Sequence, residues 1–264
     1  MDENELIEKI TKEILSKLEK MNKEDAGKGN KAENSASSSH ITPKELAGYI
    51  DHTLLKPGAT QEQFEQLCDE ALHYKFKSVC VNSSWVSFVA KKLRGSSVKV
   101  CSVIGFPLGE MATRSKAFEA RNAIANGAHE LDMVMNIGAL KSRNLKLVEE
   151  DIRAIKRACR STTLLKVIIE TSLLTEEEKV LACEISKKAG ADFVKTSTGF
   201  TGAGATAEDV ALMRRVVGPK MGVKASGGIR DYKTAVAMIQ AGANRIGAGG
   251  SVSIMKGIPS SENY

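Results

Sequence analysis

Short runs rich in β-branched residues alternate with helix-forming stretches from about residue 42 onward, and this alternation restricts the possible folds most. Eight runs are predicted as strands: 49–54, 78–82, 98–104, 130–135, 164–170, 192–196, 222–225 and 244–247. Eight strand–helix units joined by right-handed crossovers close into a (β/α)8 barrel, the TIM-barrel fold. A doubly wound open sheet is the alternative for an α/β chain of this pattern.

An internal repeat supports the barrel. The segments NGAHELDMV, AGADFVKTS and AGANRIGAG each place a Gly-Ala pair between the end of a helix and the start of a strand, at Gly127, Gly190 and Gly242. The separations are 63 and 52 residues, each about two strand–helix units. The repeat therefore marks alternate strands of one repeating architecture.

The composition is typical of a globular chain. Apolar residues make up 42% and charged residues 27%, which excludes wholesale disorder. No apolar run approaches the ~18–20 residues needed to cross a membrane, and the N-terminus lacks the apolar segment of a secretory signal. The cysteines show no CxxC spacing, so a reducing, cytoplasmic compartment is expected, with no disulfide framework and no metal site. They are Cys68, Cys80, Cys101, Cys159 and Cys183.

The net charge of +6 is unevenly distributed, with −2 in residues 1–40 and +8 in residues 41–264. A basic body could bind nucleic acid, but no stretch combines a block of basic residues with interleaved aromatics. Aromatic residues are only 5% of the chain, which also argues against a stacking surface for bases or sugars. A small phosphorylated ligand is the simpler interpretation.

The N-terminal region is predicted to be separate from the barrel of residues 42–264. Residues 3–21 carry an apolar stripe at helical spacing: Leu6, Ile7, Ile10, Ile14, Leu18 and Met21. Glu-to-Lys pairs four residues apart support a short amphipathic helix. Residues 22–41 hold one large aliphatic residue and no aromatic one, so a flexible, disordered linker is expected, with a reach of roughly 25 Å.

Three charged residues interrupt otherwise apolar strands: Asp132, Lys195 and Lys224. A lysine that points into a small barrel is costly unless it is paired or deprotonated. One such lysine is most simply a structural ion pair or an outward-facing side chain. Two on successive strands, with a carboxylate on a nearby strand, favour a chemical role.

The chemistry expected of these three residues is imine formation. A free lysine amine, with a pKa of ~10.4, is only about 0.1% neutral at pH 7.5 and is a poor nucleophile. A second ammonium at ~6 Å, with an effective dielectric constant of ~20, disfavours protonation by about 2.8 kcal/mol, or roughly two pKa units. One amine could then attack a carbonyl and form a Schiff base, with Asp132 holding the other lysine charged.

Two glycine-rich loops are predicted to bind phosphate. One, SGGIR, follows the seventh predicted strand, and the other, GAGGS, follows the eighth. Loops after these two strands are the usual phosphate site of a TIM barrel, because backbone N–H groups can face the anion there. The alternative is that both are only tight turns.

Six segments resemble the deoxyribose-phosphate aldolase family, whose members are class I aldolases. The segments are IDHTLLKP (50–57), VCVN (79–82), VIGFPLG (103–109), ELDMVMNIG (130–138), FVKTSTGF (193–200) and VKASGGIR (223–230). The resemblance runs from about residue 42 to the C-terminus. Its most specific part is VKTSTG followed by K-x-S-G-G one strand–helix unit later.

This resemblance implies roles for particular residues. Lys195 would be the Schiff-base lysine, and Asp132 and Lys224 would relay protons. Tyr264, the last residue, could assist proton transfer at the enamine carbon, the alternative being a frayed end without a role. No cofactor and no metal are implied.

The resemblance also implies a substrate site. Asp51 would be a supporting carboxylate near the substrate hydroxyls, and Cys80 a reactive thiol near the mouth. Further predicted substrate contacts are Thr196, Gly227, Gly228, Arg230, Gly249 and Gly250. Family members commonly carry two serines where this chain has Gly249 and Gly250. Phosphate binding is therefore expected to weaken, or unphosphorylated aldehydes to be tolerated better, unless Ser251 substitutes.

The implied reaction is the reversible cleavage of 2-deoxy-D-ribose 5-phosphate to acetaldehyde and D-glyceraldehyde 3-phosphate, a step of deoxyribonucleotide catabolism. Another Schiff-base aldolase acting on a different phosphorylated sugar is the closest alternative. A catalytically silent sugar-phosphate sensor or scaffold is a second. Partners expected are the sugar phosphate, acetaldehyde and a second copy in a homodimer, with no nucleic acid and no membrane.

The N-terminal helix resembles the encapsulation peptides of enzymes enclosed in bacterial microcompartments. Its apolar stripe at residues 3–21 could be buried against a shell protein, which would place the enzyme inside such a compartment. Alternatives are self-association, packing on the barrel, and binding to a membrane surface. The balance of acidic and basic residues on the polar face disfavours an anionic membrane.

Overall fold

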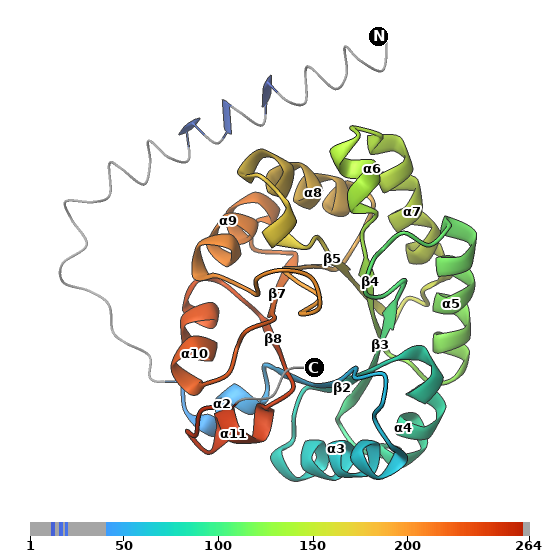
Figure 1. Ribbon diagram of the computed structural model, residues 1–264, viewed down its shortest axis with the longest axis vertical. Helices are drawn as coiled ribbons and strands as arrows, with labels where there is room; N and C mark the ends of the chain where they lie inside the picture. Colours follow the sequence, from blue (N-terminus) through green and yellow to red (C-terminus); the bar gives the residue numbers. More distant parts are fainter. Residues whose placement is uncertain (1–11, 14–15, 18, 21–40, 261–264) are drawn as a thin grey trace, which may run out of the picture.

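A computed structural model describes residues 12–13, 16–17, 19–20 and 41–260, and its centre is a closed ring of parallel strands (Figure 1). The strands are β1 (Ile50–Leu54), β2 (Ser78–Val81), β3 (Lys99–Ile104), β4 (Glu130–Val134), β5 (Leu164–Ile168), β6 (Phe193–Lys195), β7 (Gly222–Ser226) and β8 (Arg245–Ala248). Each pairs with its neighbour in chain order, and β8 pairs with β1. The (β/α)8 barrel is confirmed, and the open sheet is excluded.

Helices surround the ring (Figure 1). They are α2 (Pro43–Ala47), α3 (Gln61–Tyr74), α4 (Val86–Lys92), α5 (Thr113–Ala125), α6 (Ile137–Lys141), α7 (Leu145–Ala158), α8 (Glu176–Lys188), α9 (Ala207–Val217), α10 (Tyr232–Gln240) and α11 (Ser251–Met255). The local sequence determines where several of these helices begin. Thr175 and Glu178, for example, form a capping box at the first turn of α8, each side chain bonding the other's backbone N–H.

The strand boundaries differ from the predicted ones by at most two residues. The largest difference is in β5, which was predicted to continue to residue 170 but ends at Ile168. Glu170 has a positive φ of 53°, and a short 3-10 turn, Thr171–Leu173, follows it. The apolar and β-branched run cannot reveal this reversal, because nothing in its composition requires a left-handed residue.

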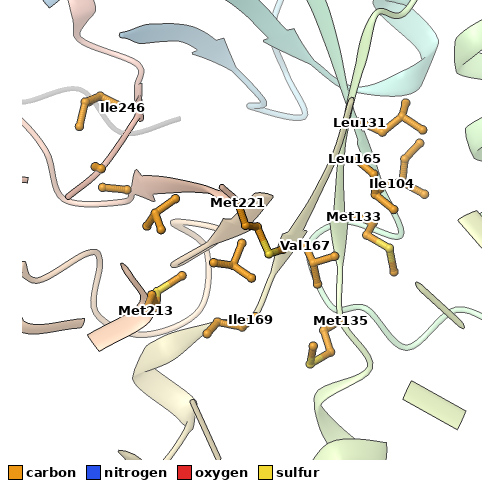
Figure 2. Close-up of a cluster of buried hydrophobic side chains, with 14 of the residues drawn as sticks. Ile104, Leu131, Met133, Met135, Leu165, Val167, Ile169, Met213, Met221 and Ile246 are labelled. Carbon is orange, nitrogen blue, oxygen red and sulfur yellow. The ribbon is translucent and has the colours of Figure 1, made fainter. Parts of the chain in front are cut away.

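The main hydrophobic core lies between the strands and the helices. Leu131 and Met133 on β4 are fully buried in a cluster with Ile104, Leu165 and Val167 (Figure 2). Successive strand residues point to opposite faces, so Asp132, between Leu131 and Met133, points to the barrel axis. The outward-facing apolar side chains of the strands therefore pack against the helices, and the inward-facing positions can carry polar groups.

The predicted N-terminal helix and linker lie mostly outside the described residues. Of the helix, Lys12–Glu13, Ser16–Lys17 and Glu19–Lys20 are helical and exposed. Lys17 Nζ lies 2.9 Å from a carboxylate oxygen of Glu184 on α8. Among the described residues, no helix combines the length and the apolar composition that crossing a bilayer requires.

Candidate active site

Asp132 and three lysines meet on the axis of the barrel. Lys195 Nζ and Lys224 Nζ lie 2.8 and 2.7 Å from the same carboxylate oxygen, Oδ2 of Asp132. The two nitrogens therefore cannot be more than 5.5 Å apart. Lys166 Nζ lies 2.8 Å from the other oxygen, Oδ1. The predicted lysine pair and carboxylate are thus in direct contact, and a third lysine joins them.

The register of the sheet brings these side chains together. Lys195 and Lys224 are directly paired across β6 and β7, and Asp132 is paired with Lys166 across β4 and β5. Lys195 is the last residue of β6, so it lies at the C-terminal end of the barrel, where TIM-barrel enzymes carry their active sites. It is 3% exposed, whereas Asp132 and Lys224 are fully buried.

The electrostatics keep Asp132 and Lys224 charged. Burial alone would raise the pKa of Asp132, but the three ammonium groups outweigh it and hold that pKa well below its usual range. Burial would lower the pKa of Lys224, yet Asp132 and Asp51 raise it well above the usual lysine value. Lys224 is therefore protonated at neutral pH, beside Lys195.

Further charged residues surround this cluster. Asp51 contacts Lys224 Nζ at 2.5 Å and Arg245 Nη1 at 2.6 Å. Arg245 also binds Glu130, and Glu130 contacts Lys166 at 2.7 Å. The ion pairs thus form a closed network through the barrel interior.

The net charge of this network depends on how many of its lysines are protonated. Its cations are Lys166, Lys195, Lys224 and Arg245, and its carboxylates are Asp51, Glu130 and Asp132. Four positive and three negative groups leave one surplus positive charge, which is costly in a buried site. The network becomes neutral when one lysine gives up its proton. Lys195 is the lysine of the three with any exposure to solvent.

Asp51 was expected near the substrate hydroxyls, and that role stays a prediction. Its carboxylate is fully buried and contacts Lys224 Nζ. Asp51 lies early in β1, where it is paired with Gly247 and Ser78.

Cys80 was expected to be a reactive thiol near the mouth, and that role stays a prediction. The residue is fully buried on the inner face of the sheet, opposite Cys101 on the neighbouring strand. The hydrogen bond with Cys101 lowers the pKa of the Cys80 thiol, while burial raises that of Cys101. Cys101 Sγ lies 3.1 Å from Asp132 Oδ1.

The two thiols and Asp132 are the one group among the described residues whose ligand atoms are close enough to hold a metal ion. The cysteine spacing in the sequence could not show this, because β2 and β3 bring the two residues together. Three ammonium groups already contact the carboxylate, and they oppose a further cation.

The loop after β7 is shaped by close backbone contact. Gly227 and Gly228 have φ values of 86° and 74°, a conformation that favours glycine. Gly227 packs against Gly204 from the loop after β6, where a Cβ would lie 2.1 Å from the Gly227 carbonyl oxygen. Arg230 is exposed at the end of the loop. Its carbonyl accepts a hydrogen bond of 2.9 Å from the backbone N–H of Ser260.

At Gly249 and Gly250 the loop after β8 has backbone N–H groups as hydrogen-bond donors and no side-chain hydroxyl. Gly249 and Gly250 precede the short helix α11, which begins at Ser251. The Ser251 hydroxyl is buried and donates to the carbonyl of Ala248 at 2.9 Å. The Ser251 hydroxyl proton is therefore engaged within the protein, and the effect of Gly249 and Gly250 on phosphate binding stays a prediction.

Two more predicted residues need comment. Thr196 is buried, and its hydroxyl donates to the Ser226 carbonyl and accepts from the Ser226 N–H, both at 3.0 Å. These bonds tie the end of β6 to β7, and the predicted contact of Thr196 with substrate stays a prediction. Tyr264 lies outside the described residues. The contact between Ser260 and Arg230 brings the described end of the chain to the loop after β7.

Sequence reasoning missed Lys166, Glu130, Arg245 and Cys101. A signal was present for Glu130, two residues before Asp132 and so on the same face of its strand. Lys166 likewise interrupts an apolar run, LLKVII. A glutamate shortly after β5 was also missed. Glu170 accepts hydrogen bonds from Thr198 and Thr201, and so holds the loop after β6.

Comparison with known proteins identifies the family. The model of the DeoC/LacD family aldolases matches residues 46–256. A deoxyribose-phosphate aldolase from Streptococcus gordonii is 64% identical over 219 residues, 83% of this chain and 99% of that protein. The chain belongs to the DeoC/LacD aldolase family. Deoxyribose-phosphate aldolase 1 of Bacillus licheniformis is 61% identical, over 84% of this chain and 99% of its own length.

Solved structures agree with this assignment. A deoxyribose phosphate aldolase from Aeropyrum pernix, described as tetrameric, has a TM-score of 0.76 at 37% identity. The match covers 81% of this chain and 91% of that one. The barrel and the aldolase family therefore rest on sequence and structure together, and the chain is a carbon–carbon lyase of this family.

Proposed function

We propose that this aldolase cleaves 2-deoxy-D-ribose 5-phosphate to acetaldehyde and D-glyceraldehyde 3-phosphate, and that Lys195 is the nucleophile. The contact of Lys195 and Lys224 with one Asp132 oxygen is the observation that carries this proposal. It places an amine at the C-terminal end of the barrel beside a protonated lysine, Lys224, that can act as an acid. The names of the relatives support the choice of substrate.

The reaction follows from these positions. Deprotonated Lys195 attacks the aldehyde carbon, C1, and loss of water from the adduct forms an imine. Removal of the proton from the C3 hydroxyl then breaks the C2–C3 bond, releasing glyceraldehyde 3-phosphate and leaving an enamine on Lys195. A proton added at C2 converts the enamine to an imine, and hydrolysis releases acetaldehyde.

Lys224 and Asp132 handle the protons in this scheme. Lys224 can donate to the hydroxyl that leaves as water, and later toward C2 through a water molecule or Tyr264. Asp132 stays ionised, and its Oδ2 contacts both Lys195 and Lys224. A proton lost by one of these lysines can therefore be returned from the other. The substrate phosphate is assigned to the backbone N–H groups of the loops that contain Gly228 and Gly250.

The experiment that tests this function is trapping with borohydride. Incubation with acetaldehyde and reduction should leave an ethyl group on Lys195, found by peptide mass spectrometry. The single modified lysine would establish the imine, the nucleophile and the acetaldehyde half of the substrate together. An adduct spread over surface lysines, or none, would contradict the proposal. An adduct at Lys195 with a different carbonyl compound instead would indicate another Schiff-base aldolase.

We further propose that residues 3–21 direct the enzyme to the shell of a bacterial microcompartment. The apolar stripe at helical spacing supports this, as does the helical, exposed polar face at Lys12–Glu13 and Ser16–Lys17. A fluorescent reporter fused to residues 1–40 should gather in the assembled shells of a host cell. Uniform cytosolic fluorescence in cells that do assemble shells would refute the targeting role.

A further inference from the structure

Two adjoining depressions open at the N-terminal end of the barrel, opposite Lys195. The larger, about 500 Å³, lies between the loop after α4 and the end of α5. The smaller, about 260 Å³, extends from there to the loop before β5. Both are lined by Lys99, Gly127 and His129. The aldolase chemistry described above uses neither of them.

The side chains that line these depressions carry uncompensated positive charge. Lys91, Arg94 and Lys99 line the larger depression, and Arg160 lines the smaller. All four are exposed, and none forms an ion pair with a carboxylate among the described residues. The one acidic residue of the lining, Glu130, is buried and is bound to Lys166 and Arg245.

Basic residues close to the depressions behave differently. Lys92, next to Lys91 on α4, lies 3.4 Å from Glu65. Lys156, near the end of α7, lies 2.6 Å from Asp192. Within the part of the chain that the structure describes, these two lysines have acidic partners and the four cations that face the depressions have none. The uncompensated charge is therefore local and is not simply the basic character of the chain.

His129 adds a fixed donor to the same surface. Its Nδ1 accepts a hydrogen bond of 3.1 Å from the backbone N–H of Val100, so the proton of the neutral ring is on Nε2. Partial burial and the charge of Lys99 lower the pKa of His129, which keeps the ring neutral near pH 7. The ring therefore offers an N–H donor beside Lys99.

We propose that this cationic groove, formed by Lys91, Arg94, Lys99, His129 and Arg160, binds a small polyanion with the charge of a diphosphate. Two joined depressions with cations along both suit an elongated anion better than a single phosphate. His129 is the sole aromatic ring in either lining, so charge rather than base stacking would recognise the ligand. The groove is separate from the phosphate loops after β7 and β8, which lie at the opposite end of the barrel.

The test is titration with inorganic pyrophosphate, followed by calorimetry and by the ring signals of His129 in NMR. The chain has four histidines, and a His129→Gln variant identifies the signal. Saturable binding with a shift of the His129 signal is expected. An Arg94→Ala/Lys99→Ala variant should bind at least about tenfold more weakly. The matched control is Lys220→Ala, an exposed lysine before β7 that lines neither depression.

Three results would overturn the proposal. The first is pyrophosphate binding that leaves the His129 signal unmoved, since the anion would then occupy the substrate loops. The second is equal affinity in the wild type and in the Arg94→Ala/Lys99→Ala variant, with both shown to be folded by circular dichroism. The third is binding of ADP more than tenfold tighter than pyrophosphate, because recognition would then involve the base and not charge alone.

Discussion

A Lys195→Arg variant is expected to lose aldol cleavage by on the order of 10⁴-fold or more while remaining folded. Arginine keeps the positive charge that Asp132 binds, so the electrostatic partner is retained. A guanidinium stays protonated at all relevant pH values and cannot form the imine. The measurement is kcat with 2-deoxyribose 5-phosphate, coupled to oxidation or reduction of the glyceraldehyde 3-phosphate released.

The same variant distinguishes the nucleophile from its neighbours. Borohydride and acetaldehyde should leave no ethyl group on Lys195→Arg protein, although Lys224 and Lys166 are still present. Both remain charged beside carboxylates, as the raised pKa of each shows. If the ethyl group appeared at Lys224 instead, Lys195 would not be the nucleophile. Unchanged thermal unfolding would show that the loss is chemical.

The sequence predicted the barrel and the grouping of Lys195 and Lys224 for a clear physical reason. Lys195 and Lys224 are conspicuous because the positions around them are apolar, and their strands are neighbours in chain order. In a parallel barrel, neighbours in chain order are neighbours in space. Asp132 is two strands away from Lys195, and its contact follows from the small width of an eight-stranded barrel.

The contacts of Asp51, Glu130 and Arg245 could not be predicted in the same way. Arg245 binds Asp51 across the closure of the barrel, between β8 and β1. This contact depends on strand stagger, which the hydrophobic pattern does not encode. The assignment of Asp51 to the substrate stays a prediction.

The charge network links stability to catalysis. Asp132 neutralises part of the charge of three lysines, and Asp51 and Glu130 contact Lys224 and Lys166. Removing any carboxylate leaves an excess of buried positive charge, whereas removing a lysine brings the network closer to balance. Carboxylate and lysine substitutions should therefore differ in their effect on folding, and Asp132 is the position at which both stability and activity depend on one side chain.

An Asp132→Asn variant is expected to lose about 3–5 kcal/mol of unfolding free energy at pH 7, because three ammonium groups lose their shared partner. The pKa of Asp132 is depressed in the folded protein, so its stabilisation is complete above the ordinary aspartate pKa of ~3.9 and is lost as the pH falls below it. The difference in unfolding free energy between the wild type and the variant should therefore shrink below about pH 4. Urea unfolding of both proteins at pH 7 and pH 3 measures this difference.

Two comparisons make this prediction specific. Glu149→Gln changes a carboxylate to an amide at the surface pair with Lys188, and it should cost no more than about 1 kcal/mol. Lys166→Met, added to Asp132→Asn, removes one of the unpaired charges and should recover part of the lost stability without recovering activity. A stability loss in Asp132→Asn that is the same at pH 7 and pH 3, and that Lys166→Met leaves unchanged, would mean that packing and not charge determines the role of Asp132.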